Sequence, residues 1–469
     1  MLFNSLVFVE LLFITFILYY QKWLLKYQVL ILILASLFFY AYNNPALLIL
    51  LLFSAGINVL SSYYVAYGKV SNRKLIATAG VVFNLSILAF FKYSPLISTS
   101  LFEINNSIGQ FLLTIPLPIG ISFYTFEGIS LLVDVFKEKK DDSKSLANSS
   151  FKEHASRTLF FISFFPHLVS GPILKAHDFL PQIKAKFFKE IDWEQCFKTI
   201  ILGYFLKMVV ADNLKDFTYW IAFPYFQGYT SVTLITLLFG YSCQIFADFA
   251  GYSLIAIGIA QLFGYKLINN FNFPYISSSI QEFWKRWHIS LSSFLMEYLY
   301  FPLGGNRKGK VRTYINLIIT MFLGGLWHGA AWSYAIWGLV HGTALAIERM
   351  CKGKVKLGSS KIVIFFRRIA VFCLVTFAWL FFKLPEFTQV LAYLKTIGTT
   401  LSFSPDKALC FNILLYSSPV FLYHFFYLLK QNKQFETSFE KYSYIFYGAM
   451  LFLILCNSGS SGSFIYFQF

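Results

Sequence analysis

Residues 313–348 read TYINLIITMFLGGLWHGAAWSYAIWGLVHGTALAIE. Two apolar runs, 313–327 and 331–348, are joined here by only three residues. Each run approaches the ~20 residues that a membrane-spanning helix needs. Lipid offers no hydrogen-bond partners, so the backbone of a membrane-spanning segment must form its hydrogen bonds within the protein, as a helix does. Such a pair of runs therefore predicts two helices connected by a tight turn. The sequence therefore indicates a membrane protein built from helices.

The composition supports the same fold class over the whole chain. Of 469 residues, 57% are hydrophobic and 13% are charged, whereas a soluble chain has about a quarter charged residues. Comparable apolar runs recur from residue 4 to residue 457, which predicts an all-α polytopic protein with ~10–12 transmembrane helices and some re-entrant helices. We expect one membrane domain, 1–456, followed by a tail, 457–469. Residues 265–305 are too polar to span lipid and too apolar for a free loop, so we expect them to be re-entrant.

The charge distribution gives an orientation. The chain has 39 basic and 22 acidic residues, a net charge of +17. The basic residues lie in short clusters between apolar runs, which is typical of cytoplasmic loops and not of a nucleic-acid-binding face. The clusters are 69–74, 137–144, 307–312, 352–368 and 430–433. One further apolar run then places the tail on the outer face.

Histidines within the apolar runs are the first candidates for chemistry, because ionisable groups at membrane depth are costly. His328 is a candidate general base; a buried histidine that bonds two helices is the alternative. His288 would share a helix face with Trp284, four residues away, although an interfacial helix explains this spacing as well. His341, on the next helix, can approach His328. The six cysteines form no CxxC pair and no carboxylate follows at ligand spacing, so we expect no metal site.

Four other residues are candidates with open alternatives. Glu127 and Asp248 lie in apolar runs, where each needs a partner or a wet cavity, and Asp248 is as consistent with a helix-packing network. Arg286 is expected to face lipid headgroups or an anionic substrate. Tyr466, in the C-terminal SGSFIYFQF, is either an interfacial anchor or a nucleophile that needs an adjacent base.

Six ordered motifs resemble the membrane-bound O-acyltransferase family, in its bacterial branch of alginate and peptidoglycan O-acetyltransferases. They are LPIGISFYTFEGISLLVDVF (117–136), FFPHLVSGPILKAHDFLPQI (164–183), QIFADFAGYSLIAIGIAQLFGYKLINNFNFPY (244–275), FWKRWHISLSSF (283–294), YLYFPLGGNRKG (298–309) and LGGLWHGAAWSYAIWGLVHG (323–342). The resemblance implies a ring of helices around a central tunnel, with His328 as the catalytic histidine and His288 as the second polar residue of the core. Residues with structural or tunnel-lining roles are then Trp284, Arg286, Trp287, Ser290, Asp248, Trp327, His341 and Glu127. The chain departs from the family pattern at Leu254, His167 and Glu127, which affects the lining and not the catalytic histidine.

The tail FIYFQF is similar to the end of a small companion protein of cell-envelope D-alanylation systems. That similarity implies that Tyr466 accepts the acyl group. The family further implies acetyl-CoA as donor on the cytoplasmic face, a periplasmic O-acetyltransferase of the GDSL/SGNH type as partner, and a location in the bacterial inner membrane among its lipids. We expect peptidoglycan as acceptor, with alginate or another exopolysaccharide, and D-alanyl transfer to teichoic acid, as alternatives. A transporter or flippase is the alternative of a different class, although no internal repeat supports it.

Overall fold

The computed structural model describes residues 1, 3–102, 106–138, 146–147, 150–169, 171–352, 360–400 and 404–460. Within these ranges the regular structure is entirely helical, and no strand occurs. The chain forms two compact units: 1–199 with 255–268, and 200–254 with 269–469. The prediction of an all-α protein is confirmed.

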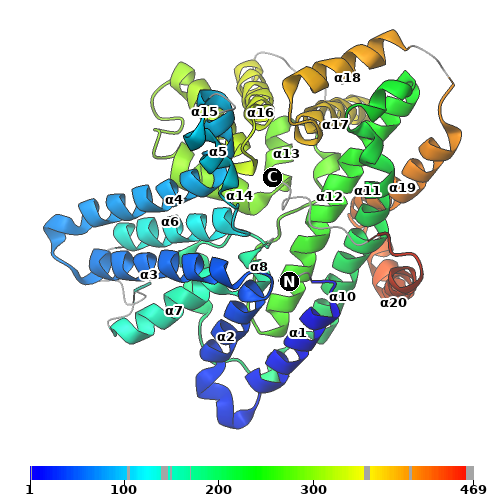
Figure 1. Ribbon diagram of the computed structural model, residues 1–469. Coiled ribbons are helices and arrows are strands. Elements are labelled where there is room, and N and C mark those ends of the chain that lie inside the picture. Colours follow the sequence, from blue (N-terminus) through cyan, green and yellow to red (C-terminus); the bar gives the residue numbers. More distant parts are fainter. Residues whose placement is uncertain are drawn as a thin grey trace. The chain divides into compact units, whose positions relative to one another are not determined.

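The first unit is a group of packed helices. The blue and cyan helices α3, α4 and α6 lie side by side in Figure 1, and α3 also packs against α7. The helices of this unit are α1 (Leu6–Tyr19), α2 (Gln28–Ala41), α3 (Pro45–Tyr67), α4 (Arg73–Leu101), α5 (Ser107–Thr114), α6 (Ile121–Lys137), α7 (Phe151–Ser163), α8 (Phe165–Leu168) and α9 (Ala176–Phe179), with most of α10 (Trp193–Tyr204) and the end of α12 (Ser231–Leu262).

Polar side chains join the central helices of this unit. Asn58 on α3 and Asn84 on α4 each donate an amide hydrogen bond to the other's Oδ1, at 3.2 and 2.9 Å. Gly128 on α6 allows this contact, because a Cβ there would lie 2.6 Å from the Asn58 amide group. In an apolar environment such paired amides satisfy each other, and the small residue lets the third helix approach.

The second unit contains the longest helix and most of the short ones. Its members are η5 (Phe205–Ala211), α11 (Asp212–Thr218), η6 (Tyr219–Ile221), η7 (Tyr225–Gly228), most of α12, η8 (Pro274–Ile276), α13 (Ile280–Arg286), α14 (Ile289–Leu295), η9 (Met296–Tyr300), α15 (Lys310–His328), α16 (Trp332–Cys351), α17 (Lys361–Lys383), α18 (Phe387–Thr399), α19 (Lys407–Leu429) and α20 (Lys433–Cys456). Residues 265–305, expected to be re-entrant, contain the four short segments η8, α13, α14 and η9.

The pair predicted from residues 313–348 is present as α15 and α16. The two helices cross so closely that side chains would not fit at the contact. A Cβ at Gly325 would lie 2.2 Å from the Tyr334 carbonyl oxygen, and a Cβ at Gly338 would lie 2.3 Å from the Met321 carbonyl oxygen. The glycines therefore set the distance between the helices, as small residues do in membrane proteins.

In the described part of the chain, seven helices are long and apolar enough to cross a membrane. This confirms a multi-pass membrane protein, although the number is lower than the ~10–12 helices expected. The pair α15 and α16 is not among the seven, because its charged and strongly polar residues lower the mean hydropathy, chiefly Arg312, Asn316, Glu348 and Arg349. The seven are Lys22–Ala41, Pro45–Tyr67, Val70–Leu101, Ser231–Leu262, Lys361–Lys383, Lys407–Leu429 and Lys433–Cys456.

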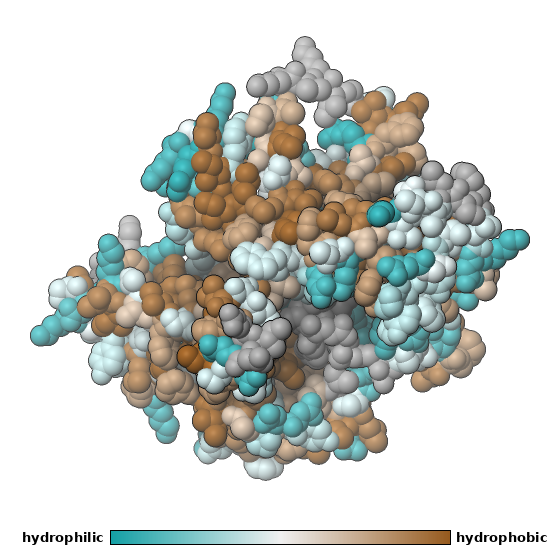
Figure 2. Space-filling model, turned by 45° about the horizontal axis from the view of Figure 1, so that its top comes forward, coloured by the Kyte–Doolittle hydropathy of each residue, from teal (hydrophilic) through white to brown (hydrophobic). Residues whose placement is uncertain are grey.

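The surface is strongly apolar, as expected for a protein in lipid. Brown, hydrophobic residues cover much of the face seen in Figure 2. Large apolar side chains are exposed on α1 and α20, including Phe13 at 64% and Leu455 at 78%. A soluble monomer seldom exposes such extended apolar areas.

Candidate functional site

His328 is the last residue of α15, at the turn into α16. Its side chain is buried in an aromatic cage within the second unit. The ring centres of Trp327, Trp337 and Phe382 lie 5.1, 5.2 and 5.1 Å from that of His328. The imidazole ring of histidine is the side chain that most often acts as a general base, so this chemistry is available at the end of α15.

His288 lies at a break in the backbone, between α13 and α14. Its φ angle is +44°, in the left-handed region that a residue with a Cβ seldom adopts. The expectation that Trp284 and His288 share one helix face is therefore wrong, because α13 ends at Arg286 and α14 begins at Ile289. The turn directs His288, which is fully buried, against Phe249, with ring centres 4.6 Å apart.

The two histidines lie close together, with 6.2 Å between their ring centres. At this separation the ring nitrogens are too far apart for a direct hydrogen bond. Trp327 contacts both rings, at 5.1 Å from His328 and 6.0 Å from His288. The two histidines are therefore neighbours on one tryptophan ring and are not bonded directly to each other.

Asn270 holds the turn that carries His288, and sequence reasoning missed it. Its backbone carbonyl accepts the Ile289 N–H at 2.9 Å. Its side-chain Oδ1 accepts the Ser290 N–H at 3.2 Å and the Ser290 hydroxyl at 2.6 Å, while its Nδ2 donates to Ser253 Oγ at 3.1 Å. Asn270 is 1% exposed. The signal that the sequence offered for Asn270 was its place as a polar residue in the unusual stretch 265–305.

The other aromatic candidates form one block around His341. The His341 ring is nearly parallel to that of Phe283, 6.2 Å away, and it meets Trp284 and Trp337 edge-on at 5.2 and 4.7 Å. Trp337 therefore contacts both His341 and His328, so the hairpin brings the two histidines onto one aromatic cluster. Trp287, also in this block, lies 5.0 Å from Trp379.

Arg286 has partners within the protein. Its Nε donates to Glu282 Oε1 at 3.0 Å, and its Nη1 donates to the Asn272 carbonyl at 3.0 Å. Burial raises the pKa of Glu282, but hydrogen bonds from Ser278 and the Arg286 charge outweigh burial and hold that pKa below its usual range. Arg286 therefore stabilises the α13 end next to His288.

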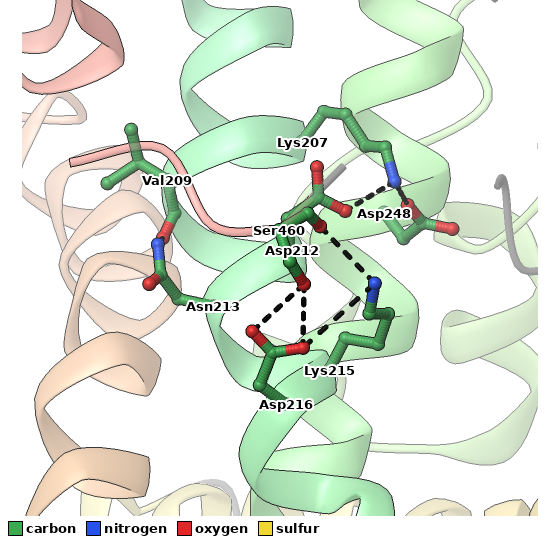
Figure 3. A network of polar contacts seen from close by, with 8 residues as sticks. All are labelled: Lys207, Val209, Asp212, Asn213, Lys215, Asp216, Asp248 and Ser460. Carbon is green, nitrogen blue, oxygen red and sulfur yellow. Dashed lines mark hydrogen bonds and ion pairs between the residues drawn. The ribbon is translucent and has the colours of Figure 1, made fainter. Parts of the chain in front are cut away.

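Asp248 belongs to a buried ion triad (Figure 3). The Lys207 Nζ donates to Asp212 Oδ1 and to Asp248 Oδ1, both at 2.7 Å. All three side chains are at most 4% exposed. The Lys207 ammonium also lies 5.3 Å from the Tyr252 ring centre. Asp248 therefore belongs to a network that packs helices together, and its partner is Lys207. The sequence alone did not indicate this partner, because Lys207 lies 41 residues away.

The remaining candidates lie elsewhere. Glu127 on α6 belongs to the first unit, where its Oε1 lies 2.9 Å from Nδ1 of His167 on α8, and both side chains are fully buried. Tyr466 lies outside the described residues. Across the ranges that the structure describes, no three His, Cys, Asp or Glu side chains are grouped to hold a metal ion.

Comparison with known proteins gives a consistent set of relatives. A sequence model of the membrane-bound O-acyltransferase family matches residues 29–385. A probable alginate O-acetylase of Azotobacter vinelandii is 37% identical over 395 residues, which cover 82% of this chain and 75% of that protein. A peptidoglycan O-acetyltransferase of Helicobacter pylori is 36% identical, covering 78% and 72%. A teichoic acid D-alanyltransferase of Bacillus subtilis is 30% identical, covering 66% and 77%.

Proposed function

This chain belongs to the membrane-bound O-acyltransferase family and is a multi-pass membrane enzyme of that class, and we propose that it transfers an acetyl group to a cell-envelope polysaccharide. The observation that carries the proposal is the buried pair His288 and His328 in one aromatic cage. We propose a location in the bacterial inner membrane and acetyl-CoA, docked from the cytoplasmic side, as donor. Acetyl is preferred to D-alanyl because the O-acetylating relatives are 36–37% identical and the D-alanyltransferase is 30% identical.

His328 is the general base of this proposal. It removes the phenolic proton of Tyr466, because a free phenol is protonated at neutral pH and becomes a nucleophile only after a base takes its proton. The phenolate oxygen then attacks the thioester carbonyl carbon. The new C–O bond forms, the C–S bond breaks, and the leaving thiolate takes the proton back from His328. The products are an acetyl-tyrosine ester and free CoA thiol.

His288 stabilises the oxyanion of the tetrahedral intermediate in this mechanism. The rings of His288 and His328 are too far apart to bond to each other. This geometry favours a role of His288 on the substrate over a role in orienting His328. A donor that is held by packing before the charge develops is the arrangement in which such stabilisation is largest.

The acetyl group then needs a second enzyme. A phenyl ester on an outer-face tail is a good acyl donor, so we propose that a periplasmic O-acetyltransferase of the GDSL/SGNH type moves it to a sugar hydroxyl. Peptidoglycan is the acceptor that we propose. Alginate or another exopolysaccharide is the second candidate, because the probable alginate O-acetylases match the chain at the same level of identity.

Mass spectrometry of the C-terminal peptide tests the proposal. The full-length protein is incubated with acetyl-CoA, and we expect an acetyl adduct on Tyr466. In the His328→Ala variant the adduct rate should fall ~100–10,000-fold, the usual contribution of a general base. The matched control is His424→Ala: this histidine is also buried in the second unit, but its Nδ1 bonds to the Val420 carbonyl at 2.7 Å. It should retain activity per folded molecule.

Other outcomes separate the alternatives. An unmodified tail with acetyl still reaching a polysaccharide would overturn the tyrosine relay and leave direct transfer. An adduct formed only from an aminoacylated carrier protein would replace acetyl with D-alanyl. A transporter predicts no thioester-dependent modification of any component.

A further inference from the structure

The described end of the chain is held by a specific set of contacts in the second unit. The Gly459 N–H donates to the Met208 carbonyl at 2.9 Å. The Asn213 Nδ2 donates to the Asn457 carbonyl at 3.0 Å. The Ser460 hydroxyl donates to both carboxylate oxygens of Asp216, at 2.8 and 3.0 Å. Figure 3 shows Ser460 beside Asp216 and Lys215.

The π-helical turn η5 explains why this surface can bind a peptide. In a π-helix each N–H reaches back five residues, and the Asp212 N–H accordingly donates to the Lys207 carbonyl. The following carbonyls accept other donors: that of Met208 takes the Gly459 N–H, and that of Val209 takes the Asn213 side chain at 2.9 Å. The π-turn interrupts the regular α-helical hydrogen-bond pattern, and at this turn the Met208 carbonyl accepts a hydrogen bond from the tail.

Gly459 fits this surface only because it lacks a side chain. A Cβ there would lie 2.5 Å from the Asn213 backbone nitrogen and 2.5 Å from the Asp212 carbonyl carbon. Both neighbours are backbone atoms of a helix, so they cannot move aside easily. The contact is thus selective for glycine at this position of the tail.

The buried triad of Lys207, Asp212 and Asp248 anchors the surface that binds residues 457–460 to the neighbouring helix α12. Lys207, within the π-turn, forms ion pairs both with Asp212, directly after the turn, and with Asp248 on α12. Gly251 on α12 lies against the same turn, because a Cβ there would be 2.8 Å from the Lys207 backbone nitrogen. The binding surface for the tail is therefore rigidly connected to the helix that also carries Phe249, the partner of His288.

We propose that Met208, Val209, Asn213, Lys215 and Asp216 form a tail clamp that sets the point from which the acyl-accepting tyrosine is presented. This inference rests on the proposed function of Tyr466. Tyr466 lies six residue steps after Ser460, so the chain can span at most about 20 Å between them. Without the clamp the tether begins at Cys456, where α20 ends, and its maximum span is about 35 Å. The clamp thus confines the nucleophile to a smaller volume and a fixed direction, which raises its effective concentration.

The test is a pair of glycine substitutions in the full-length protein. Gly459→Ala places a methyl group against backbone, whereas Gly448→Ala on α20 has no atom within 4 Å of the new carbon. Two readouts are followed: hydrogen exchange of the Gly459 amide, which bonds to the Met208 carbonyl, and the rate of the acetyl adduct on Tyr466. We expect Gly459→Ala to lose amide protection and to slow the adduct about tenfold or more, since small misplacements of a nucleophile have large effects. Gly448→Ala should leave both readouts within twofold of the unmodified protein.

Asn213→Ala guards against a folding defect, because it removes the bridge to Asn457 without adding bulk. Asn213→Ala should lower the amide protection and the rate of adduct formation, both by less than Gly459→Ala does. Loss of protection with an unchanged adduct rate would overturn the clamp as a positioning device, and an unprotected Gly459 amide in the unmodified protein would overturn the clamp itself. A protected Gly459 amide with no adduct in the unmodified protein would instead refute the tyrosine relay, and the positioning role with it.

Discussion

Asn270 illustrates how one residue can determine a site without touching the chemistry. It makes three hydrogen bonds to Ile289 and Ser290, directly after the strained His288. A positive φ on a residue with a Cβ persists only when its surroundings over-determine it. We infer that Asn270 is a positioning residue for His288.

Asn270→Ala should therefore affect the chemical step more than donor binding. We expect kcat to fall about 10–100-fold with little change in KM for the thioester donor, because a displacement of about 1 Å at a catalytic group has effects of this size. Asn270→Asp keeps the Oδ acceptors, and the Ser253 hydroxyl can turn to donate to it, so this variant should recover most of the rate. Steady-state kinetics of the purified variants give both parameters.

The matched control for Asn270 is Asn84→Ala in the first unit. Asn84 is equally buried and also bonds through its side chain, to Asn58 and to the Gly80 carbonyl. It should lower stability but leave kcat per folded molecule within about threefold. Equal losses of kcat in the two variants would mean that Asn270 is merely structural.

At the scale of elements, the close crossing of α15 and α16 depends on glycine. Gly338→Ala brings a methyl group to 2.3 Å from the Met321 carbonyl oxygen, so the helices must separate. Overpacking of this kind costs about 1–3 kcal/mol, and the movement displaces His328 at the end of α15. We expect a lower melting temperature and lower activity.

Gly398→Ala on α18 is the control for this crossing, because nothing lies within 4 Å of its new Cβ. Alanine is the better helix former, so stability should stay the same or rise. The measurement is the melting temperature of both variants, obtained by thermal unfolding in detergent. An unchanged melting temperature for Gly338→Ala would show that the crossing tolerates a wider separation.

The helices were predictable from sequence where local signals were sufficient. The pair 313–348 was expected because two apolar runs meet at small residues, and α15 and α16 lie there. The break at His288 was not, since FWKRWHISLSSF continues as an apolar-periodic segment. The turn is imposed by hydrogen bonds that Ile289 and Ser290 donate to Asn270, which lies eighteen residues before His288. For the same reason Lys207 could not be assigned to Asp248: the pairing is tertiary.

At the scale of the whole molecule, the question is on which side of the membrane each end of a helix lies. Three of the seven apolar helices follow Cys351: α17, α19 and α20. An odd number of crossings places Cys351 and Cys456 on opposite sides. The basic cluster 352–368 predicts a cytoplasmic Cys351 by the positive-inside rule, so we expect Cys456 and the tail clamp on the outer face.

The native cysteines provide the measurement, because Cys351 and Cys456 are both exposed. Each is kept as the single cysteine of the full-length protein, and intact cells are treated with a membrane-impermeant maleimide. We expect Cys456 to react in intact cells and Cys351 to react only after the membrane is opened. Cys373, within the apolar helix α17, is the control for slow labelling in lipid. If Cys351 and Cys456 reacted from the same side, the number of crossings would be even. Tyr466 would then lie on the donor's side of the membrane, where an outer transferase cannot reach it, and the relay would have to be abandoned.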